Sequence, residues 1–599
     1  MSPRLAFVAS SAGNLFMHEL LELLADGARA RGVQAEVVLD RWPEPEPGLA
    51  CVAVPHETFG FLPPSGDERR RTVALCTEQP GTTWFERAAA HAATCGAVVD
   101  VSRVGVLGLR REGITAAHVQ LGWCPALEAA PRHAERPVDV LYMGSAAPRR
   151  EVLLSGYADV LWPWRSRLLI PPHWAKTRER GDFVVGDRKR ALVAGAKLLL
   201  SVRRQPEGYF EWLRALDAIA GGAVLVAEHG AGFAPLVPGE HLVLGGARAL
   251  GLLAEGLLRD PARREAIAAA ALAFVRAELP MGIDALMAAA EQASAQPLTG
   301  RGERAAPVAA SGPESPARAP DDPVAAAAAR RAITERRAAE RAAATDPDAL
   351  EELHRTPAYA ACSAPRVAVC VPAYQAAATL EAALRSVARQ TIAPDLELLV
   401  HDDHCPDGSG ELAATWARRH PELAVRVVRR AANAGLPAGR NALTALARAR
   451  YVLALDADNE LLPPCAERLA DALDADPEAA FAYPILAVHA EGEPAGLLSS
   501  LAWDPELLAH FNPIDALALL RLSALEEAGG WTEDLDLYGW EDWDLWCALA
   551  ARGRHGVHVP ELLARYRRAP GSMLATTDLD QHAKLGRLAQ RHPSVFSRN

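Results

Sequence analysis

Two pairs of acidic residues in the last third of the chain could carry out chemistry. The first is Asp456 and Asp458, at the end of the apolar segment YVLALDAD (451–458). Alternate residues share one face of a strand, and where the chain turns at its end both carboxylates can reach one cation. Two hard oxygen ligands suit Mg²⁺ or Mn²⁺, which can bridge the two phosphates of a diphosphate. Alone, this pair is weak evidence, because solvated acidic turns are common.

The second pair, Glu541 and Asp542, lies among tryptophans in the segment GGWTEDLDLYGWEDWDLWCALAARG (529–553). The tryptophans at 540, 543 and 546 have the spacing of residues that pack along a helix. Trp540, next to the acidic pair, could instead stack on a sugar ring.

Polar turns follow other apolar segments. VHDD (400–403) offers carboxylates that could accept the N3–H of a uracil and the hydroxyls of a ribose, and HCPDGSG (404–410) follows it as a turn. NAGLPAGRN (433–441) opens a helix, with Arg440 available to bind phosphate or to hold the acidic residues. The sequence therefore has several polar groups suited to a nucleotide.

The elements that must position these groups form an α/β domain. Apolar strands are expected at 367–374, 396–403 and 451–458, with an amphipathic helix at 378–390. Strands that are apolar throughout belong in a parallel sheet covered on both faces. Ligands bind at the carboxyl ends of such strands, which is where the acidic residues fall.

In this order and spacing, the segments resemble family-2 glycosyltransferases of the GT-A fold, over roughly residues 360–575. The resemblance implies a metal-dependent (Mn²⁺ or Mg²⁺) transfer from a nucleotide-diphospho-sugar, with UDP preferred, by direct displacement with inversion. The acceptor would be a glycan, glycolipid or (glyco)protein. GWED (539–542) matches the family's acceptor motif. One departure is that several relatives place a third metal ligand, a histidine, after this motif, whereas 559–574 contains no histidine.

The resemblance assigns roles residue by residue. Asp542 is expected to be the base, Glu541 to hydrogen-bond the acceptor, and Asp456 and Asp458 to bind the metal, with Asp458 preferred as direct ligand. The expected donor-binding residues are Pro372, Ala373, Tyr374, Asp402, Asp403, Asn433, Gly435, Arg440 and Asp456, with Asn441 completing the motif and Trp540 on the sugar.

The first 295 residues alternate short β-branched runs with helical stretches, which predicts parallel sheets with crossover helices. One set of strands is expected at 5–10, 35–39, 51–54, 72–76 and 96–102. A second set is expected at 138–144, 197–202, 223–228 and 241–245. Two Rossmann-like lobes, 1–130 and 131–295, with a cleft between them are therefore predicted.

This half resembles GT-B glycosyltransferases, nearest to the CgeB-like group. The likeness rests on VDVLYMGSAAPRREVLLSGYA (138–158), AKLLLSVRRQ (196–205) and WLRALDAIAGGAVLVAEHG (212–230). Glycine turns and helix N-termini attract phosphate. A second candidate donor site is implied at Gly144, Ser145, Arg150, Arg214, Asp217 and Glu228, with Asp217 in place of the more usual glutamate.

Residues 296–360 are expected to join this half to the C-terminal domain, 361–599. The stretch 296–323 is rich in Pro, Gly, Ser and Ala and has no apolar periodicity, as in a flexible linker. AAAAARRAITERRAAERAAA (325–344) consists of strong helix formers with few large apolar residues. We expect a solvated helix there, with a partner-binding helix as the alternative.

Whole-chain properties exclude some classes. The 599 residues carry a net charge of −12, which argues against general nucleic-acid binding. No apolar run approaches the ~20 residues that span a bilayer, and no signal peptide is recognisable, so a cytoplasmic protein is expected. Nine scattered cysteines without a C-x-x-C pair predict neither a zinc site nor a disulfide framework.

Three hypotheses follow. The chain is a bifunctional bacterial enzyme that adds two sugars in polysaccharide, glycolipid or glycoprotein biosynthesis. Alternatively, only the C-terminal domain is catalytic and the N-terminal half binds acceptor or forms a dimer. In the third, both halves are inactive scaffolds, which the presence of all four acidic residues disfavours.

Overall fold

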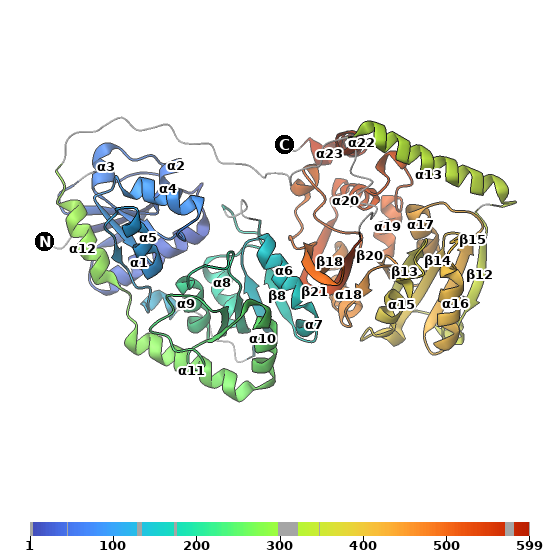
Figure 1. Cartoon of the computed structure of the whole chain (residues 1–599), viewed down its shortest axis with the longest axis horizontal. Coiled ribbons are helices and arrows are strands. Elements are labelled where there is room, and N and C mark those ends of the chain that lie inside the picture. Colours follow the sequence, from blue (N-terminus) through green and yellow to red (C-terminus); the bar gives the residue numbers. More distant parts are fainter. Residues whose placement is uncertain are drawn as a thin grey trace. The chain divides into compact units, whose positions relative to one another are not determined.

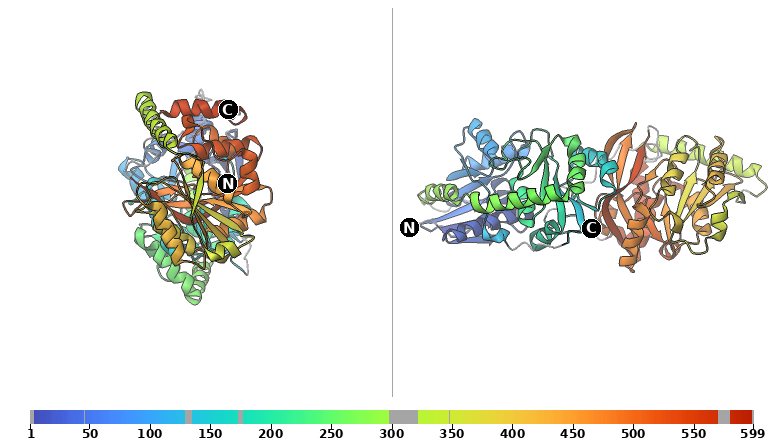
Figure 2. Two further views of the ribbon diagram at one scale, coloured as in Figure 1. Left: turned by 90° about the vertical axis from the view of Figure 1, so that its right-hand side faces the viewer. Right: turned by 90° about the horizontal axis from the view of Figure 1, so that it is seen from below.

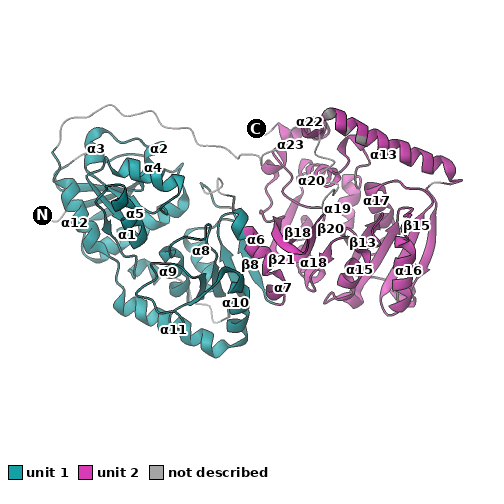
Figure 3. Cartoon of the chain, in the orientation of Figure 1, with its two compact units in different colours: residues 1–150, 164–314 teal, residues 151–163, 315–599 magenta. Residues whose placement is uncertain are grey.

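The computed structural model describes residues 4–44, 46–128, 135–172, 177–297, 322–346, 348–569 and 580–597. The chain divides into two compact units (Figures 1 and 3). Unit 1 comprises residues 1–150 and 164–314, and unit 2 comprises residues 151–163 and 315–599. Most of the linker expected at 296–323 lies outside the described residues.

Unit 1 contains two separate parallel sheets. The first has the order β2 (Ala35–Leu39), β1 (Arg4–Ala9), β3 (Leu49–Ala53), β4 (Thr72–Cys76), β5 (Ala97–Asp100) and β6 (Ala117–His118). Helices α1 (Leu15–Ala30) and α12 (Ile283–Ser294) share one apolar core with this sheet. Because α12 comes from the end of the unit, the chain returns to its first sheet.

The second sheet has the order β11 (Val243–Gly245), β10 (Val224–Glu228), β9 (Ala196–Ser201), β7 (Val138–Met143) and β8 (Ser166–Leu169). Its strands are apolar and buried, as a sheet covered by helices requires. The two parallel sheets confirm the α/β class predicted for this half. Strand β8 was not foreseen.

The described residues of unit 2 form one mixed sheet of ten strands, much of which Figure 1 shows. Its centre is parallel, in the order β15 (Ala424–Arg430), β14 (Leu396–Asp402), β13 (Val367–Ala373) and β16 (Tyr451–Ala454). The sheet continues through β20 (Leu519–Arg521), which is antiparallel to both β16 and β18 (Ala479–Ala490), and then through β21 (His555–Arg568), which is parallel to β18. This is the α/β domain that the sequence predicted.

Alternation along β13 separates the two faces of the sheet. Val367, Val369 and Val371 pack with α15 (Leu380–Ala388), α16 (Ser409–Arg419) and α18 (Cys465–Ala475). Ala368 and Cys370 face the opposite side and share a core with α17 (Leu436–Leu446). Because these central strands are parallel, the polar residues that follow them collect at the carboxyl ends of the strands.

The segment 322–361 contains, besides the expected helix, a strand that belongs to the sheet of unit 2. Helix α13 (Pro323–Ala343) lies at the surface of unit 2 as one long helix (Figures 1 and 2). Strand β12 (Leu350–Arg355) then pairs antiparallel with β15 and forms the edge of the sheet. Side chains of α13 contact the domain instead of facing only solvent, as described below.

Candidate active site

The acidic pair of the LDAD segment lies directly after β16, at the edge of the sheet. Asp456 accepts a hydrogen bond from Arg440 at 2.7 Å. Burial raises the pKa of Asp458 to about 6, and the charge of Asp456 adds to that shift. The two carboxylates therefore influence each other electrostatically.

Arg440 joins this pair to the acceptor motif. It projects from α17 and is only 3% exposed. One of its nitrogens binds Asp456, and another lies 3.1 Å from Glu541 Oε1. Its guanidinium also lies 4.7 Å from the centre of the Trp531 ring. The structure thus assigns Arg440 the second of its two expected roles, that of holding the acidic residues.

Glu541 and Asp542 begin helix α20 (Glu541–Ala551), where backbone N–H groups favour negative charge. Glu541 is buried, and its second oxygen accepts a hydrogen bond from the backbone N–H of Gly539 at 2.8 Å. Asp542 accepts one from the side-chain amide of Asn512 at 2.9 Å. Burial, followed by the charge of Glu541, raises the pKa of Asp542 to about 8.

A further carboxylate, Asp515, belongs to this cluster and was missed in the sequence. Burial and the charge of Asp456 raise its pKa to about 7, and Asp515 in turn raises the pKa of Asp542. Its Oδ1 accepts a hydrogen bond from the backbone N–H of Leu517 at 2.9 Å. The only sequence signal was an acidic residue directly before a buried strand, in FNPIDALALL (511–520).

A cavity of about 550 Å³ opens beside Asp458. Side chains of both signs line it, among them Glu460, His489, Arg565, Tyr566 and Arg567. Burial raises the pKa of Tyr566, and the charge of Asp515 is the next cause. The carboxylate of Asp458 therefore faces space large enough for part of a ligand, whereas Asp456 is held by Arg440.

The residues expected to bind the donor lie at the ends of β13 and β14. Asp402 is fully buried and pairs with Arg429 and with the backbone N–H of Cys405. Both oxygens of Asp403 accept hydrogen bonds, from the N–H groups of Ala434 (3.0 Å) and Gly435 (2.7 Å). In the structure, these two carboxylates hold the backbone around the site.

The remaining expected residues fall around the same edge. Pro372 and Ala373 end β13, and Tyr374 follows them. The Asn433 amide donates to the carbonyl of Asp403 at 3.3 Å. Asn441 exchanges hydrogen bonds with the backbone of Trp531, at 2.9 Å in each direction.

Trp540 packs within the protein. Its ring lies 4.6 Å from that of Trp543 and 5.4 Å from the ammonium of Lys584. The indole N–H groups of Trp543 and Trp546 donate to backbone carbonyls of Leu508 and Ile514. Trp540 itself is 8% exposed, so a sugar would meet at most one edge of its ring.

The acidic pair also fits a divalent metal. No set of three or more His, Cys, Asp or Glu side chains is arranged around one metal position within the described ranges. Asp456 and Asp458 nevertheless provide hard oxygen ligands, and a cation between them would offset the repulsion that raises the pKa of Asp458. Part of 559–574, where relatives place a histidine, lies outside the described residues.

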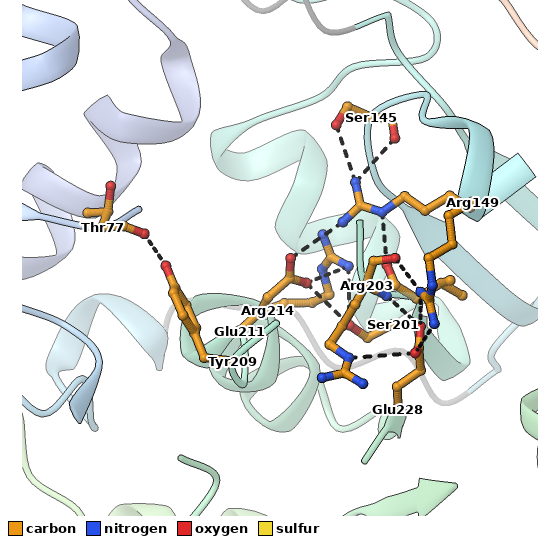
Figure 4. Close-up of polar contacts among 11 residues, drawn as sticks. Thr77, Ser145, Arg149, Ser201, Arg203, Tyr209, Glu211, Arg214 and Glu228 are labelled. Atoms are coloured by element: carbon orange, nitrogen blue, oxygen red, sulfur yellow. Dashed lines mark hydrogen bonds and ion pairs between the residues drawn. The ribbon is translucent and has the colours of Figure 1, made fainter. Parts of the chain in front are cut away.

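Unit 1 has its own cavity, of about 580 Å³. Residues that follow strands of both its sheets line this space, and so do five of the six residues expected at a second donor site: Gly144, Ser145, Arg150, Arg214 and Asp217. The sixth, Glu228, lies outside the lining. It is buried and receives hydrogen bonds from Arg149 (2.6 Å) and from the backbone N–H of Arg203 (2.7 Å) (Figure 4).

Two arginines of this cavity converge on a glutamate that the sequence did not reveal. Arg214 lies 2.7 Å from Glu211 (Figure 4). Arg150 lies 3.5 Å from the same carboxylate. Burial alone would raise the pKa of Glu211, but the two arginines lower it overall. Arg150 also donates to the hydroxyl and carbonyl oxygens of Ser145, each at 3.2 Å. The spacing of Glu211 and Arg214 at i, i+3 was the available signal.

Asp217 is paired inside the same cavity. Lys189 lies 2.9 Å from Asp217 and 2.8 Å from Glu19, which is on α1. Lys189 is buried, and the two carboxylates raise its pKa against the opposing effect of burial. This triad links helices that belong to the two sheets of unit 1.

Comparison with known proteins agrees with these features. Residues 368–520 match the model of glycosyl transferase family 2, and residues 136–280 match the model described as glycosyl transferase-like. The chain thus contains a family-2 glycosyltransferase domain towards its C-terminus and a glycosyltransferase-like region in its N-terminal half. This confirms the fusion that the sequence predicted.

The matched relatives are similar only over parts of the chain. An uncharacterized protein, y4gI of Sinorhizobium fredii, is 29% identical over 224 residues, 37% of this chain and 24% of that protein. The uncharacterized glycosyltransferase EpsJ of Bacillus subtilis is 34% identical over 107 residues, 18% of this chain and 30% of that protein. The chain therefore spans less than a third of the length of these two curated relatives.

A solved structure, S. aureus TarS (residues 1–349) in complex with UDP, is 17% identical to the chain. The likeness covers 38% of this chain and 72% of that one, with a TM-score of 0.30, which is too low to establish a shared fold. Within the parts that the structure describes, no helix is both long and apolar enough to cross a membrane.

Proposed function

We propose that the C-terminal domain transfers a sugar from a nucleotide-diphospho-sugar, with UDP as the nucleotide, to a hydroxyl of a glycan, glycolipid or (glyco)protein. The observation that carries this proposal is that the buried Arg440 contacts both Asp456 and Glu541, and that Asp515 and Asp542 interact electrostatically with it. It brings the strand-end acidic pair and the acceptor motif into one electrostatic unit. The family-2 match of residues 368–520 supports the same reaction class.

In the proposed mechanism, the oxygen of the acceptor hydroxyl bonds to the anomeric carbon while Asp542 accepts the proton of that hydroxyl. The bond from that carbon to the diphosphate breaks on the opposite side, so the configuration inverts. The side-chain N–H of Asn512 donates a hydrogen bond to Asp542 and so orients it. Glu541 is proposed to hydrogen-bond the acceptor and also fixes Arg440, which keeps the two acidic segments together.

Asp456 and Asp458 are proposed to hold Mg²⁺ or Mn²⁺, which when bound offsets the charge that develops on the diphosphate. Tyr374, Asp402, Asp403, Asn433 and Gly435 are proposed to form the nucleotide side of the site. Asp402 and Asp403 act there by holding the backbone, because their oxygens already accept hydrogen bonds.

A second candidate function belongs to unit 1. Its cavity of about 580 Å³ contains Arg150 and Arg214 beside the Gly144–Ser145 turn, which suits a second diphosphate. We propose that it is a second donor site. The alternative is that the N-terminal half binds acceptor or forms a dimer.

The test is release of nucleotide from UDP-, GDP-, dTDP- and CMP-sugars by the full chain, with and without Mn²⁺. We expect Mn²⁺-dependent release from one UDP-sugar, and its loss in Asp458→Ala. Asp471→Asn, which changes an exposed carboxylate paired with Arg366, is the matched control. Turnover of a second sugar that is lost only in Arg214→Ala would support two sites. If no donor is bound or turned over, the proposal fails.

A further inference from the structure

Helix α13 precedes the matched region 368–520 and lies against the residues proposed to bind the nucleotide. Arg336 lies over the ring of Tyr374, with 5.6 Å from its Cζ to the ring centre. Arg337 lies over Tyr538, at 5.2 Å by the same measure. Glu340 accepts a hydrogen bond from the backbone N–H of Asn433 at 3.2 Å. The helix thus contacts both the nucleotide side and the segment that leads into the acceptor motif.

Both ends of α13 are attached to the domain. Arg330, in its first half, pairs with Asp580. Arg341, near its end, makes a two-point contact with Asp348 at 3.0 and 2.9 Å. Asp348 also accepts a hydrogen bond from Arg430 of β15 at 2.8 Å. These contacts fix the position of the arginines in the middle of the helix.

Arg337 is placed directly at the nucleotide turn. A β-carbon added to Gly435 would overlap its guanidinium, so only glycine allows this approach. The charge of Arg337 also acts on Asp403 and on Tyr538, whose pKa values it lowers against the dominant effect of burial. The guanidinium therefore lies between the end of β14 and the acceptor motif.

Three other arginines near this edge are paired with carboxylates. Arg429 pairs with Asp402 and Glu411, Arg430 pairs with Asp348, and Arg440 pairs with Asp456 and Glu541. The Nε of Arg337 is buried without a hydrogen-bond partner among the described residues, as are the Nε atoms of Arg430 and Arg440; unlike those two arginines, Arg337 makes no ion pair in the described part of the chain. A buried donor left without a partner is costly, and phosphate oxygens are well suited to an arginine fork.

We propose that Arg337 is a donor-binding residue that contacts the phosphates of the nucleoside diphosphate, which makes α13 a part of the family-2 active site. The inference rests on the proposed function, because it requires a nucleotide at the ends of β13 and β14. It adds a positive charge that Arg429, Arg430 and Arg440, which are paired with carboxylates, do not supply. If α13 instead blocked the site, replacing Arg337 would strengthen the binding of the diphosphate.

The test is calorimetric titration with UDP, GDP and dTDP, and with the nucleoside of whichever diphosphate binds, of the full chain carrying Arg214→Ala so that the cavity of unit 1 does not contribute. Arg337→Ala and the similarly sized Arg337→Gln should weaken diphosphate binding roughly ten-fold or more, as expected for loss of a charged hydrogen bond. Nucleoside affinity should change less than about two-fold, because the contact is to phosphate. Arg337→Lys should recover part of the loss, since it keeps the charge.

Arg331→Ala is the matched control, because Arg331 is an exposed arginine of the same helix. Thermal unfolding of each variant checks that the domain remains folded, and Arg337→Gln serves if Arg337→Ala does not fold. Unchanged or tighter diphosphate binding in both Arg337→Ala and Arg337→Gln would overturn the inference but leave the proposed function standing. Equal weakening of diphosphate and nucleoside would also overturn it. If the wild type binds no diphosphate, the inference and the proposed function both fail.

Discussion

The guanidinium of Arg440 lies 2.7 Å from Asp456 Oδ1, and this contact ties helix α17 to the end of β16. The same guanidinium reaches Glu541 at 3.1 Å, so one buried cation holds both acidic segments of the proposed site. Since burial disfavours the charged form of an arginine, these carboxylates must outweigh that effect, and they raise its pKa. The contact is therefore a structural requirement of the site.

Replacing Arg440 should destabilise unit 2 markedly. Arg440→Ala leaves Asp456 and Glu541 without their shared partner, and loss of one member of a buried ion pair costs about 3–5 kcal/mol. Urea unfolding followed by tryptophan fluorescence measures the change. The control is Arg385→Ala, whose pair with Glu381 is about half exposed and should be worth less than about 1 kcal/mol. Equal effects of the two substitutions would contradict the role assigned to Arg440.

Asp515 should make the stability of the protein depend on pH. Its pKa is raised to about 7 in the folded state, so the folded chain binds a proton that the unfolded chain has released above pH ~4. The contribution of Asp515 to the free energy of unfolding therefore falls as pH rises from about 4 to 7. Asp515→Asn removes that loss, and it should raise the melting temperature more at pH 8 than at pH 5. A gain that is the same at both pH values would contradict the raised pKa.

The catalytic proposal predicts a pH dependence of opposite direction. Asp542 must be ionised to accept a proton, and its pKa in the free protein is raised to about 8. The value of kcat/KM should therefore rise with pH up to about 8 and then level off. The measurement is initial rate at low donor concentration between pH 5.5 and 9.5, with Asp471→Asn as control. A profile that falls over this range would exclude Asp542 as the base.

Removal of the metal should stop the reaction at the C-terminal site. EDTA should abolish nucleotide release, and Mn²⁺ should restore it in the wild type but not in Asp458→Ala. Binding of Mn²⁺ followed by electron paramagnetic resonance, in the presence of UDP, gives a readout that is independent of turnover. Asp471→Asn should bind the ion as the wild type does. Undiminished Mn²⁺ binding by Asp458→Ala would remove Asp458 from the proposed metal site.

The sequence predicted the parts of the site that follow regular strands. VAVCVPA and YVLA are apolar and LELLVHD has an apolar core, so their burial and the position of the following acidic residues could be predicted before the structure. The same reasoning predicted the two parallel sheets of unit 1. The family matches confirm the two glycosyltransferase regions identified from these motifs.

Residues outside such patterns could not be placed. Asp515 lies between irregular chain and a short strand, and its proximity to Asp456 depends on how distant segments pack. Helix α13 has few large apolar residues, so no apolar stripe indicated which surface it would cover. Its contacts are made by arginines over aromatic rings and by Glu340, which composition alone assigns to solvent.

The most direct test of the central claim is turnover of the donor sugar identified by the nucleotide-release panel, compared between the wild type and Asp542→Asn. Both should carry Arg214→Ala, so that unit 1 does not contribute. Loss of a general base predicts a fall of about 10²- to 10⁴-fold in kcat with donor binding retained. Near-normal turnover by Asp542→Asn would contradict the proposed mechanism, whatever the identity of the sugar.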